Sequence, residues 1–457
     1  MKMAWNQSIN FALATLVAAF CPTHTAKAQE APVASEPAID ITLPATDDEM
    51  AGAGPVRRYD WFHNVWKRRR TNFASRVQSD QGAVVFFGDS ITQGWGDGFR
   101  GQFAGMKTAN TGISGDTTRG MLHRLQDDVI ARDPAAVVML MGTNDLEEHA
   151  DPKTIAGNVK LIVSALKKHD PAMPIIWCDV FPSSESKSRP AEMIREINRL
   201  VHESFKGDKQ VSIVDTWTLF ANADGDAKKE EFPDLLHPNK AGYAKWHKAL
   251  LPVFETLGVS EVEPDDFQIE EGYESLFNGK DLTGWRYRVT SEKMRRGRDR
   301  WKGRPEWPLV DKEVVFTSKT ESNDGRYIAK NGRLVVTSPP EHRKIQQLWT
   351  TREFSGDFRL VLEFRAMPNA DSGVFIRQPQ LQCRDYALAG PYKQLASYKP
   401  QQWNELVIEV TGGIAKCTCN GEVIEEAMKV PPSGPIGLEG DRGQVEYRRI
   451  RIQPIAQ

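Results

Sequence analysis

The chain has 457 residues, of which 40% are hydrophobic and 26% are charged, and its formal net charge is −2. This composition is ordinary for globular proteins that bury sizeable cores, and the length indicates about three domains. Because the charges nearly balance, no global electrostatic field favours binding to nucleic acid or to an anionic membrane.

The first 28 residues predict a secretory signal peptide. Lys2 precedes the apolar stretch 11–20, and Ala26-Lys27-Ala28 supplies a cleavage site with small residues at its first and third positions. The apolar stretch is too short to cross a bilayer, and no later segment is long and apolar enough to do so. We therefore expect no membrane span and an extracytoplasmic protein, either periplasmic or secreted.

Residues 29–55 and 56–258 differ in composition. The first stretch is rich in Pro, Ala and acidic residues, which predicts a flexible linker. In the second stretch apolar runs alternate with helical patterns, which predicts a three-layer α/β domain with a parallel sheet. The apolar runs span 83–87, 106–111, 135–141, 174–181 and 211–215, and the helical patterns span 121–131, 154–169, 191–205 and 241–257.

The pattern changes after a second linker, the acidic stretch 259–271. From residue 272 to 457, short alternating strands separated by Gly and Pro turns predict an all-β sandwich. Thr411-Gly412-Gly413 and Asn420-Gly421 are typical of tight hairpin turns.

Four cysteines follow the predicted signal peptide: Cys178, Cys383, Cys417 and Cys419. Export permits disulfides, so a bridge from Cys383 to Cys417 or Cys419 is one option, although spacing does not decide the pairing. The chain has no CxxC pair and no HExxH motif. We therefore predict no metal site and no cofactor.

The run 83–87 ends in Gly88-Asp89-Ser90. A serine just beyond the carboxyl end of a buried strand lies where open α/β sheets place their chemistry. Ser90 is therefore a candidate nucleophile, provided that a histidine base lies elsewhere in the chain. The alternative is an ordinary strand-to-helix turn in which Asp89 or Ser90 caps the helix.

Three later segments offer the other groups that acyl transfer needs. Gly115 follows the second apolar run and can present its backbone N–H at close range, unless the turn alone requires the glycine. Asn144 follows the third run and carries an amide donor, unless it is a turn asparagine. His237 lies three residues after Asp234, so the pair is either a base with its orienting acid or a helix cap beside a surface histidine.

Taken together, the segments Gly88-Asp89-Ser90, Gly115, Gly142-Thr-Asn-Asp145 and Asp234-Leu-Leu-His237 resemble the SGNH (GDSL-type) hydrolases, in which such motifs occur in this order. Tyr243 and the segment from Phe181 to Asn198 look most like the branch that contains platelet-activating-factor acetylhydrolase subunits. The resemblance implies Ser90 as nucleophile, His237 as base and Asp234 as its orienting acid. It also implies an oxyanion hole formed by Gly115 N–H, Asn144 Nδ2 and the N–H of Ser90.

The segment 272–285, with support from 371–377 and 434–440, resembles the 3-keto-disaccharide hydrolase-like domains, which have a concanavalin-type sandwich. The resemblance implies a carbohydrate-directed role, either binding or glycoside cleavage. Gly440-Asp-Arg-Gly443 departs from the histidine-containing turn of that family. Four charged residues could face a sugar on one sheet surface, or form an ordinary polar face: Glu363, Arg365, Asp371 and Arg377.

The sequence therefore predicts a secreted serine esterase that hydrolyses acyl esters, chiefly acetyl esters, with a carbohydrate or a small acyl ester as its substrate. The β half would direct it to a glycan. The alternative is a glycoside-active or carbohydrate-binding protein whose main function lies in the β-sandwich.

Overall fold

A computed structural model describes residues 40–48, 50–262, 264–299, 306–338, 340 and 343–455. The predicted signal peptide at 1–28, and residues 29–39 of the predicted linker, lie outside these ranges.

The α/β half is built on a five-stranded sheet in the order β2-β1-β3-β4-β5, and every pair in it is parallel. The central strand β1 pairs with β2 on one side and β3 on the other, so that Val85 lies opposite both Ala109 and Val137. The strands are β1 Val84–Gly88, β2 Thr108–Asn110, β3 Ala136–Leu140, β4 Ile175–Cys178 and β5 Val211–Val214. Each lies within a predicted apolar run or one residue beyond it, and the predicted fold class is confirmed.

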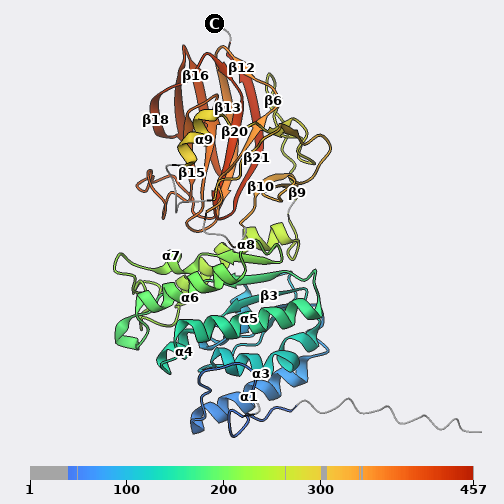
Figure 1. Cartoon of the computed structure of the whole chain (residues 1–457), viewed down its shortest axis with the longest axis vertical. Coiled ribbons are helices and arrows are strands. Elements are labelled where there is room, and N and C mark those ends of the chain that lie inside the picture. Colours follow the sequence, from blue (N-terminus) through green and yellow to red (C-terminus); the bar gives the residue numbers. More distant parts are fainter. Residues whose placement is uncertain are drawn as a thin grey trace, which may run out of the picture. The chain divides into compact units, whose positions relative to one another are not determined.

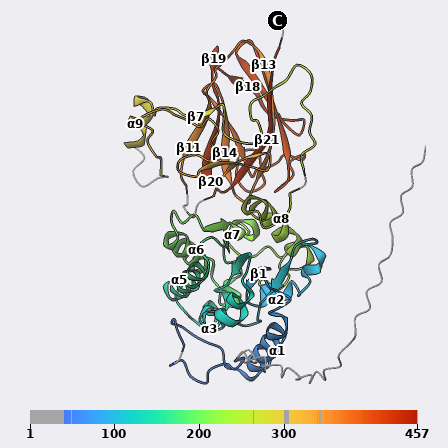
Figure 2. The ribbon, with the colours of Figure 1, turned by 90° about the vertical axis from the view of Figure 1, so that its right-hand side faces the viewer.

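Helices cover both faces of this sheet, as expected when all its strands are buried. On one face, Val85, Phe87 and Met139 pack with residues of α3, α5 and α6, and Figures 1 and 2 show these helices together on one side. On the other face, Phe86 and Val138 pack with Trp246 of α8. These four helices are α3 Thr118–Asp128, α5 Pro152–His169, α6 Ala191–Ser204 and α8 Lys240–Leu257.

The α/β half also contains helices that the sequence analysis did not predict. The long one is α1, Asp60–Arg76. The short ones are α2 Ser90–Gly94, α4 Thr143–Glu147 and α7 Thr216–Phe220, with the 3-10 turns η1 Phe99–Gly101, η2 Ile130–Arg132 and η3 Glu185–Lys187. The short helices α2 and α4 each follow the carboxyl end of a strand and carry candidate site residues.

Two segments predicted as linkers are held against neighbouring elements. Asp47 pairs with Arg58 and Arg119, and the backbone N–H of Ala53 donates to Oδ1 of Asn158 at 3.0 Å. Residues 41–48 and 50–55 are therefore not the flexible linker that their composition predicts, because polar groups of the α/β half contact them. In the predicted acidic linker, Asp265 pairs with Arg449 of the β half, so this carboxylate is not simply solvated.

The β half consists of antiparallel sheets, which agrees with the predicted sandwich. One sheet has the order β18-β17-β16-β13-β21-β10-β9, with β6 pairing β21, and the other has the order β15-β14-β20-β11-β7-β8. Strands β12 and β19 pair separately, and one helix, α9 Glu292–Asp299, lies in a connection. The strands are β6 Glu274–Ser275, β7 Trp285–Tyr287, β8 Val314–Val315, β9 Tyr327–Lys330, β10 Arg333–Val336, β11 Gln346–Thr350, β12 Phe354–Ser355, β13 Phe358–Ala366, β14 Asp371–Ile376, β15 Gln380–Arg384, β16 Asn404–Thr411, β17 Ile414–Cys419, β18 Glu422–Lys429, β19 Ser433–Gly434, β20 Ile436–Arg442 and β21 Val445–Pro454.

Both predicted hairpins are present, joining β16 to β17 and β17 to β18. Cys417 and Cys419 lie on β17 with their side chains buried, as does Cys383 on β15. The described cysteines are all free, so the disulfide considered from the sequence is not formed.

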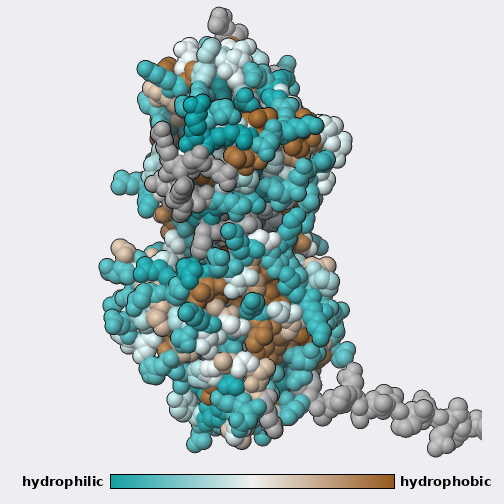
Figure 3. Space-filling model, viewed as in Figure 1, coloured by the Kyte–Doolittle hydropathy of each residue, from teal (hydrophilic) through white to brown (hydrophobic). Residues whose placement is uncertain are grey.

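Hydrophilic residues cover most of the face of the molecule that Figure 3 shows, and apolar atoms gather in patches over the α/β half. Within the described ranges, no helix combines the length and the apolar character that a membrane crossing requires.

Candidate active site

Ser90 is the first residue of α2, directly after β1 and Asp89. Asp89 is the helix cap, since its Oδ1 accepts the backbone N–H of Ile91 at 2.9 Å. Gly88 is needed for a close approach: a Cβ at this position would clash with Thr92 and would lie 2.5 Å from the backbone oxygen of Leu140 on β3. With Asp89 acting as the cap, the Ser90 hydroxyl is left for other contacts.

A chain of two hydrogen bonds joins Ser90, His237 and Asp234. His237 Nε2 lies 2.9 Å from Ser90 Oγ, and its Nδ1 lies 2.8 Å from Asp234 Oδ2. His237 comes from the loop before α8, whose cap is Asn239. Ser90 and the Asp234–His237 pair, which come from segments far apart in sequence, therefore meet at the carboxyl edge of the sheet.

Asp234 is fixed by the backbone that follows it. Its Oδ1 accepts the N–H groups of Leu236 at 3.0 Å and His237 at 2.7 Å. Partial burial works to raise the pKa of Asp234, but hydrogen bonds from the His237 backbone and imidazole and from Leu236 outweigh it and lower the pKa to about 2. The carboxylate is therefore ionised at neutral pH and can stabilise a positive charge on the imidazole.

The site is open to solvent. The side chains of His237 and Asp234 are 43% and 48% exposed, and Ser90 is half-buried. A substrate with a bulky alcohol group can therefore reach Ser90 without entering a narrow tunnel.

Asn144 lies in α4, beyond the carboxyl end of β3, and is buried. Its Nδ2 donates to the backbone oxygen of Asp116 at 2.9 Å, and its Oδ1 accepts from Nη2 of Arg189 at 3.4 Å. A side-chain amide has two N–H groups, so one remains for another acceptor. Arg189 also fixes which way the amide points, because a guanidinium can only donate.

Gly115 lies in the loop between β2 and α3 with a φ of +84°, a conformation that favours glycine. A Cβ here would clash with the indole ring of Trp61 and would lie 3.2 Å from Nη1 of Arg57. Trp61 therefore lies against Gly115, a contact that the sequence analysis did not predict.

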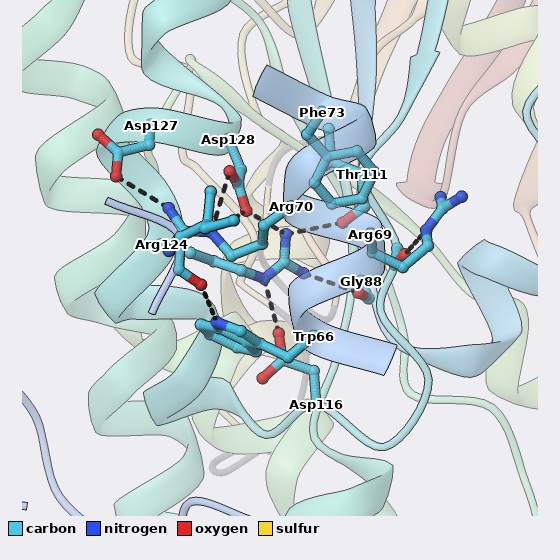
Figure 4. A network of polar contacts seen from close by, with 12 residues as sticks. Trp66, Arg69, Arg70, Phe73, Gly88, Thr111, Asp116, Arg124, Asp127 and Asp128 are labelled. Carbon is cyan, nitrogen blue, oxygen red and sulfur yellow. Dashed lines mark hydrogen bonds and ion pairs between the residues drawn. The ribbon is translucent and has the colours of Figure 1, made fainter. Parts of the chain in front are cut away.

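Beneath the loop, Arg124 of α3 connects the segments that carry Ser90 and Gly115, as Figure 4 shows. It donates to the backbone oxygens of Gly88 at 3.1 Å and Thr111 at 2.7 Å, and its Nε pairs with Asp116 at 2.7 Å. All of these groups are buried. Arg124 thus fixes the backbone just before the Asp89-Ser90 turn and the loop that presents Gly115.

Tyr243 of α8 supports α2 from the other side. Its hydroxyl donates to the backbone oxygen of Ile91 at 2.7 Å, and its ring packs on Trp95. Burial raises the pKa of Tyr243 above its ordinary value, so the hydroxyl stays neutral and acts as a donor.

Comparison with known protein families gives this geometry a context. Residues 86–245 match the GDSL-like lipase/acylhydrolase family. The α/β half contains a GDSL-like acylhydrolase domain, and the chain is an esterase-type enzyme. Residues 272–453 match the 3-keto-alpha-glucoside-1,2-lyase-like domain, so the resemblances found in the sequence are confirmed for both halves.

The human platelet-activating factor acetylhydrolase IB subunit alpha2 is 29% identical to this chain over 188 residues, which cover 40% of this chain and 81% of that one. A GDSL-like lipase from Bacteroides thetaiotaomicron is 25% identical and superposes with a TM-score of 0.37, covering 42% of this chain and 97% of its own. A lipase/acylhydrolase from Enterococcus faecalis is 22% identical with a TM-score of 0.30. The match covers 39% of this chain and 99% of that one.

Outside the GDSL domain, the four candidate sugar-binding residues do not share a surface. Glu363 and Arg365 lie on β13 of one sheet, Asp371 lies on β14 of the other, and Arg377 follows β14. The expectation of one common sheet face is therefore wrong, because the chain passes from one sheet to the other between β13 and β14.

Each of these four side chains has partners within the β half. Glu363 pairs with Arg448 and Arg449, and Arg365 with Glu446. Asp371 pairs with Arg384, while the buried Arg377 donates to the backbone oxygen of Phe354 at 2.9 Å. These contacts are those of structural ion pairs and hydrogen bonds.

Four residues outside the four motifs also lie at the candidate site: Arg57, Trp61, Arg124 and Arg189. Each contacts a residue far away in sequence, which the sequence analysis did not predict. In the part of the chain that the structure describes, no three His, Cys, Asp or Glu side chains are grouped as metal ligands.

Proposed function

We propose that this protein is a serine esterase that works outside the cytoplasm and removes acyl groups, chiefly acetyl groups, from carbohydrates. The observation that carries the proposal is the hydrogen-bonded chain Ser90–His237–Asp234 in a GDSL-like acylhydrolase domain. In this reaction class the protein needs no cofactor, since water is the second substrate.

In the acylation step, Ser90 Oγ attacks the ester carbonyl carbon while His237 Nε2 takes the hydroxyl proton. The Ser90 oxygen and His237 Nε2 are 2.9 Å apart, a suitable distance for this transfer. The Asp234 carboxylate holds Nδ1–H and stabilises the imidazolium that forms. His237 then returns the proton to the departing alcohol oxygen, leaving an acyl group on Ser90.

The tetrahedral intermediate carries a negative oxygen that needs preorganised donors. The backbone N–H groups of Ser90 and Gly115 and the second N–H of Asn144 Nδ2 fill this role. Water then attacks the acyl-enzyme with His237 again as base, and the acid and free Ser90 are released. The oxyanion donors serve both steps.

Three observations support a carbohydrate ester as substrate. The site is half-exposed, which suits an acyl group attached to a large alcohol. The second half of the chain matches a family named for glycoside chemistry. A curated relative of the GDSL domain is named an acetylhydrolase, which favours a short acyl group. The signal peptide predicted at 1–28 supports export.

The test compares the wild type with Ser90→Ala on p-nitrophenyl acetate and on partially acetylated oligosaccharides. We expect the wild type to release p-nitrophenol and acetate, and Ser90→Ala to fall to the background rate. Full activity in Ser90→Ala would overturn the assignment of the nucleophile. Cleavage of p-nitrophenyl acetate without any cleavage of the sugar esters would overturn the substrate class alone.

A second candidate function belongs to the β half, where a cavity of about 520 Å³ adjoins the six-stranded sheet. Its lining includes Trp349 and Phe375, whose ring centroids are 4.9 Å apart, together with the polar residues Arg288 and Gln347. Aromatic rings beside a few polar groups are typical of small-molecule sites. A glycoside-active or carbohydrate-binding β half predicts that Ser90→Ala still binds or cleaves a 3-keto disaccharide and that Trp349→Ala does not.

A further inference from the structure

We propose that Tyr59 and Trp61 form a platform on which the esterase stacks a pyranose ring of its acylated substrate. The inference rests on the proposed function and names the part of the molecule that recognises the sugar. It concerns residues that precede the region matched to the GDSL family, which begins at residue 86. The platform is therefore a feature of this chain in addition to the family's motifs.

The platform lies beside the reacting groups. The indole of Trp61 occupies the space that a side chain at position 115 would fill, and Arg57 lies next to it. Gly115 is the residue whose N–H we assign to the oxyanion hole. Because the acyl carbonyl of a bound ester would lie at this N–H, the alcohol part of the ester must lie within a few bonds of it.

The two rings form an exposed aromatic surface. Trp61 is 48% exposed and Tyr59 53% exposed, and their ring planes differ by only 14° with centroids 6.2 Å apart. Large aromatic side chains grouped at the surface beside a reactive site mark a ligand surface more often than isolated ones do. The two rings are stacked, and the outward face of the stack is flat and apolar, which matches the C–H face of a pyranose.

A buried arginine and two carboxylates hold the platform in place. Arg57 is buried, its Nε donates to Glu148 at 2.7 Å, and its Nη2 pairs with Glu147. Its guanidinium carbon lies 5.9 Å from the centroid of the Trp61 ring, within range of a cation–π contact. A surface fixed in this way loses little conformational entropy when a ligand binds.

The rim of the platform is polar, which favours a sugar over an aliphatic chain. The hydroxyl of Tyr59 lies 3.4 Å from Oε2 of Glu148, and Glu147 is exposed at the end of α4. Carboxylate oxygens accept several hydrogen bonds each, so they can accept from sugar hydroxyls around a stacked ring. A lipid acyl chain has no groups that would use them.

Glu147 also connects the platform to the oxyanion hole. The same carboxylate that pairs with Arg57 accepts from Arg189 Nη2 at 2.7 Å, and Arg189 in turn contacts the amide of Asn144. The platform and the Asn144 donor are thus held by one set of ion pairs. A sugar stacked on the rings is positioned relative to the group that stabilises its ester carbonyl.

The experiment measures kcat/KM of Trp61→Ala and Tyr59→Ala on two substrates, a partially acetylated xylo-oligosaccharide and p-nitrophenyl acetate. We expect kcat/KM for the oligosaccharide to fall at least about tenfold more than kcat/KM for p-nitrophenyl acetate, and mainly through KM. Trp61→Phe keeps an aromatic face and is expected to retain most of the activity. Leu161→Ala, which removes an equally exposed apolar side chain from α5, is the matched control.

The outcomes separate this inference from the proposed function. An equal fall on both substrates means that Trp61 only supports the Gly115 loop, and it overturns the platform. The platform is also overturned if the variants change kcat/KM on neither substrate. It is overturned as well if the wild type cleaves p-nitrophenyl acetate but no sugar ester. A selective fall on a short-chain phospholipid instead of the oligosaccharide would make the surface a lipid site.

Binding gives a readout that does not depend on turnover. In Ser90→Ala, calorimetric titration with the acetylated oligosaccharide is expected to give binding that is lost when Trp61→Ala is added. Unchanged binding in the double variant overturns the platform and leaves the nucleophile assignment intact. Activity in Ser90→Ala itself would overturn the proposed function instead.

Discussion

Arg189 and Asn144 are joined by a hydrogen bond from the guanidinium Nη2 to the amide Oδ1 at 3.4 Å. Arg189 is buried and its Nε also donates to the backbone oxygen of Thr143 at 3.0 Å. It thus fixes both the backbone of α4 at its start and the direction of the Asn144 amide. Without Arg189, only the bond from Nδ2 to the backbone oxygen of Asp116 would hold the amide, and its second N–H would be less firmly directed at the oxyanion.

The first prediction is that Arg189→Met lowers kcat on p-nitrophenyl acetate by about 10–10² with little change in KM. Loss of one oxyanion donor, tested directly by Asn144→Ala, typically costs ~10²–10³, and a misdirected amide is expected to cost somewhat less. Arg199→Met, which removes a half-exposed arginine that pairs with Glu196, is the control. An unchanged kcat, with Tm also unchanged, would contradict a positioning role.

The second prediction concerns Asp234. Asp234→Asn keeps the shape of the side chain but cannot stabilise the imidazolium and favours the wrong tautomer of His237, so kcat should fall by roughly 10⁴. Since the pKa of Asp234 is about 2, the wild-type carboxylate stays charged throughout the pH range of the assay. The loss of kcat in the variant is therefore expected at every pH from 5 to 8, because the carboxylate does not titrate in this range. A variant that matches the wild-type kcat at any pH in this range would contradict the assignment.

The third prediction uses Asp89, the fully buried cap of α2. Burial raises its pKa to about 6, against an ordinary value of 3.8, although the Ile91 N–H opposes the shift. Because the folded-state pKa is the higher one, this group favours folding most below about pH 4, and the contribution is lost as pH rises through about 6. The free energy of unfolding should therefore drop by about 2 kcal/mol between pH 4 and pH 7 on account of this group.

Asp89→Asn isolates that effect. The amide oxygen can still accept the Ile91 N–H, but the side chain no longer titrates. Urea unfolding at pH 4, 5, 6 and 7 should show a smaller pH dependence for the variant than for the wild type. Identical slopes would mean that Asp89 titrates at its ordinary pKa in the folded protein.

The fourth prediction concerns Arg124, which lies between Asp116 and Asp128 in the buried network of Figure 4. Arg124→Met leaves the buried carboxylate of Asp116 without its ion-pair partner, which typically costs about 3–5 kcal/mol of stability. Adding Asp116→Asn removes this charge and should recover part of the loss. Chemical denaturation of both variants measures this, and a double variant no more stable than Arg124→Met would contradict it.

Much of this fold follows from local sequence pattern. The five parallel strands are short apolar runs, and α3, α5, α6 and α8 follow helical patterns, so periodicity alone predicts them. The sequence pattern did not predict helix α1 because Arg70 takes the place of an apolar residue on its buried face. Arg70 belongs to the basic run 68–70, and such a run usually lies in solvent. Arg70 is instead buried against Asp127 and Asp128, which no local pattern reveals.

The candidate site likewise contains some residues that the sequence predicts and others that it does not. Ser90, Asn144 and Gly115 each follow a strand of the parallel sheet, and the topology brings the ends of neighbouring strands together. Trp61 and Arg189 could not be predicted, because they act through contacts with Gly115 and Asn144 that only the packed structure creates.

The four charged residues of the β half were grouped because they are close in sequence. In an antiparallel sandwich, consecutive strands need not belong to the same sheet. Between Arg365 on β13 and Asp371 on β14 the chain changes sheets, so their proximity in sequence does not become a shared surface.

Residues before the region of family similarity pack against the α/β half of this enzyme. The boundary of that similarity therefore does not mark the smallest fragment that would work. The match to the GDSL family begins at residue 86, after Arg57, Trp61 and all of α1. A fragment cut at that boundary would leave Asp127 and Asp128 without Arg70 and Gly115 without its aromatic neighbour. For dissecting the two halves, the esterase piece should therefore begin near residue 41.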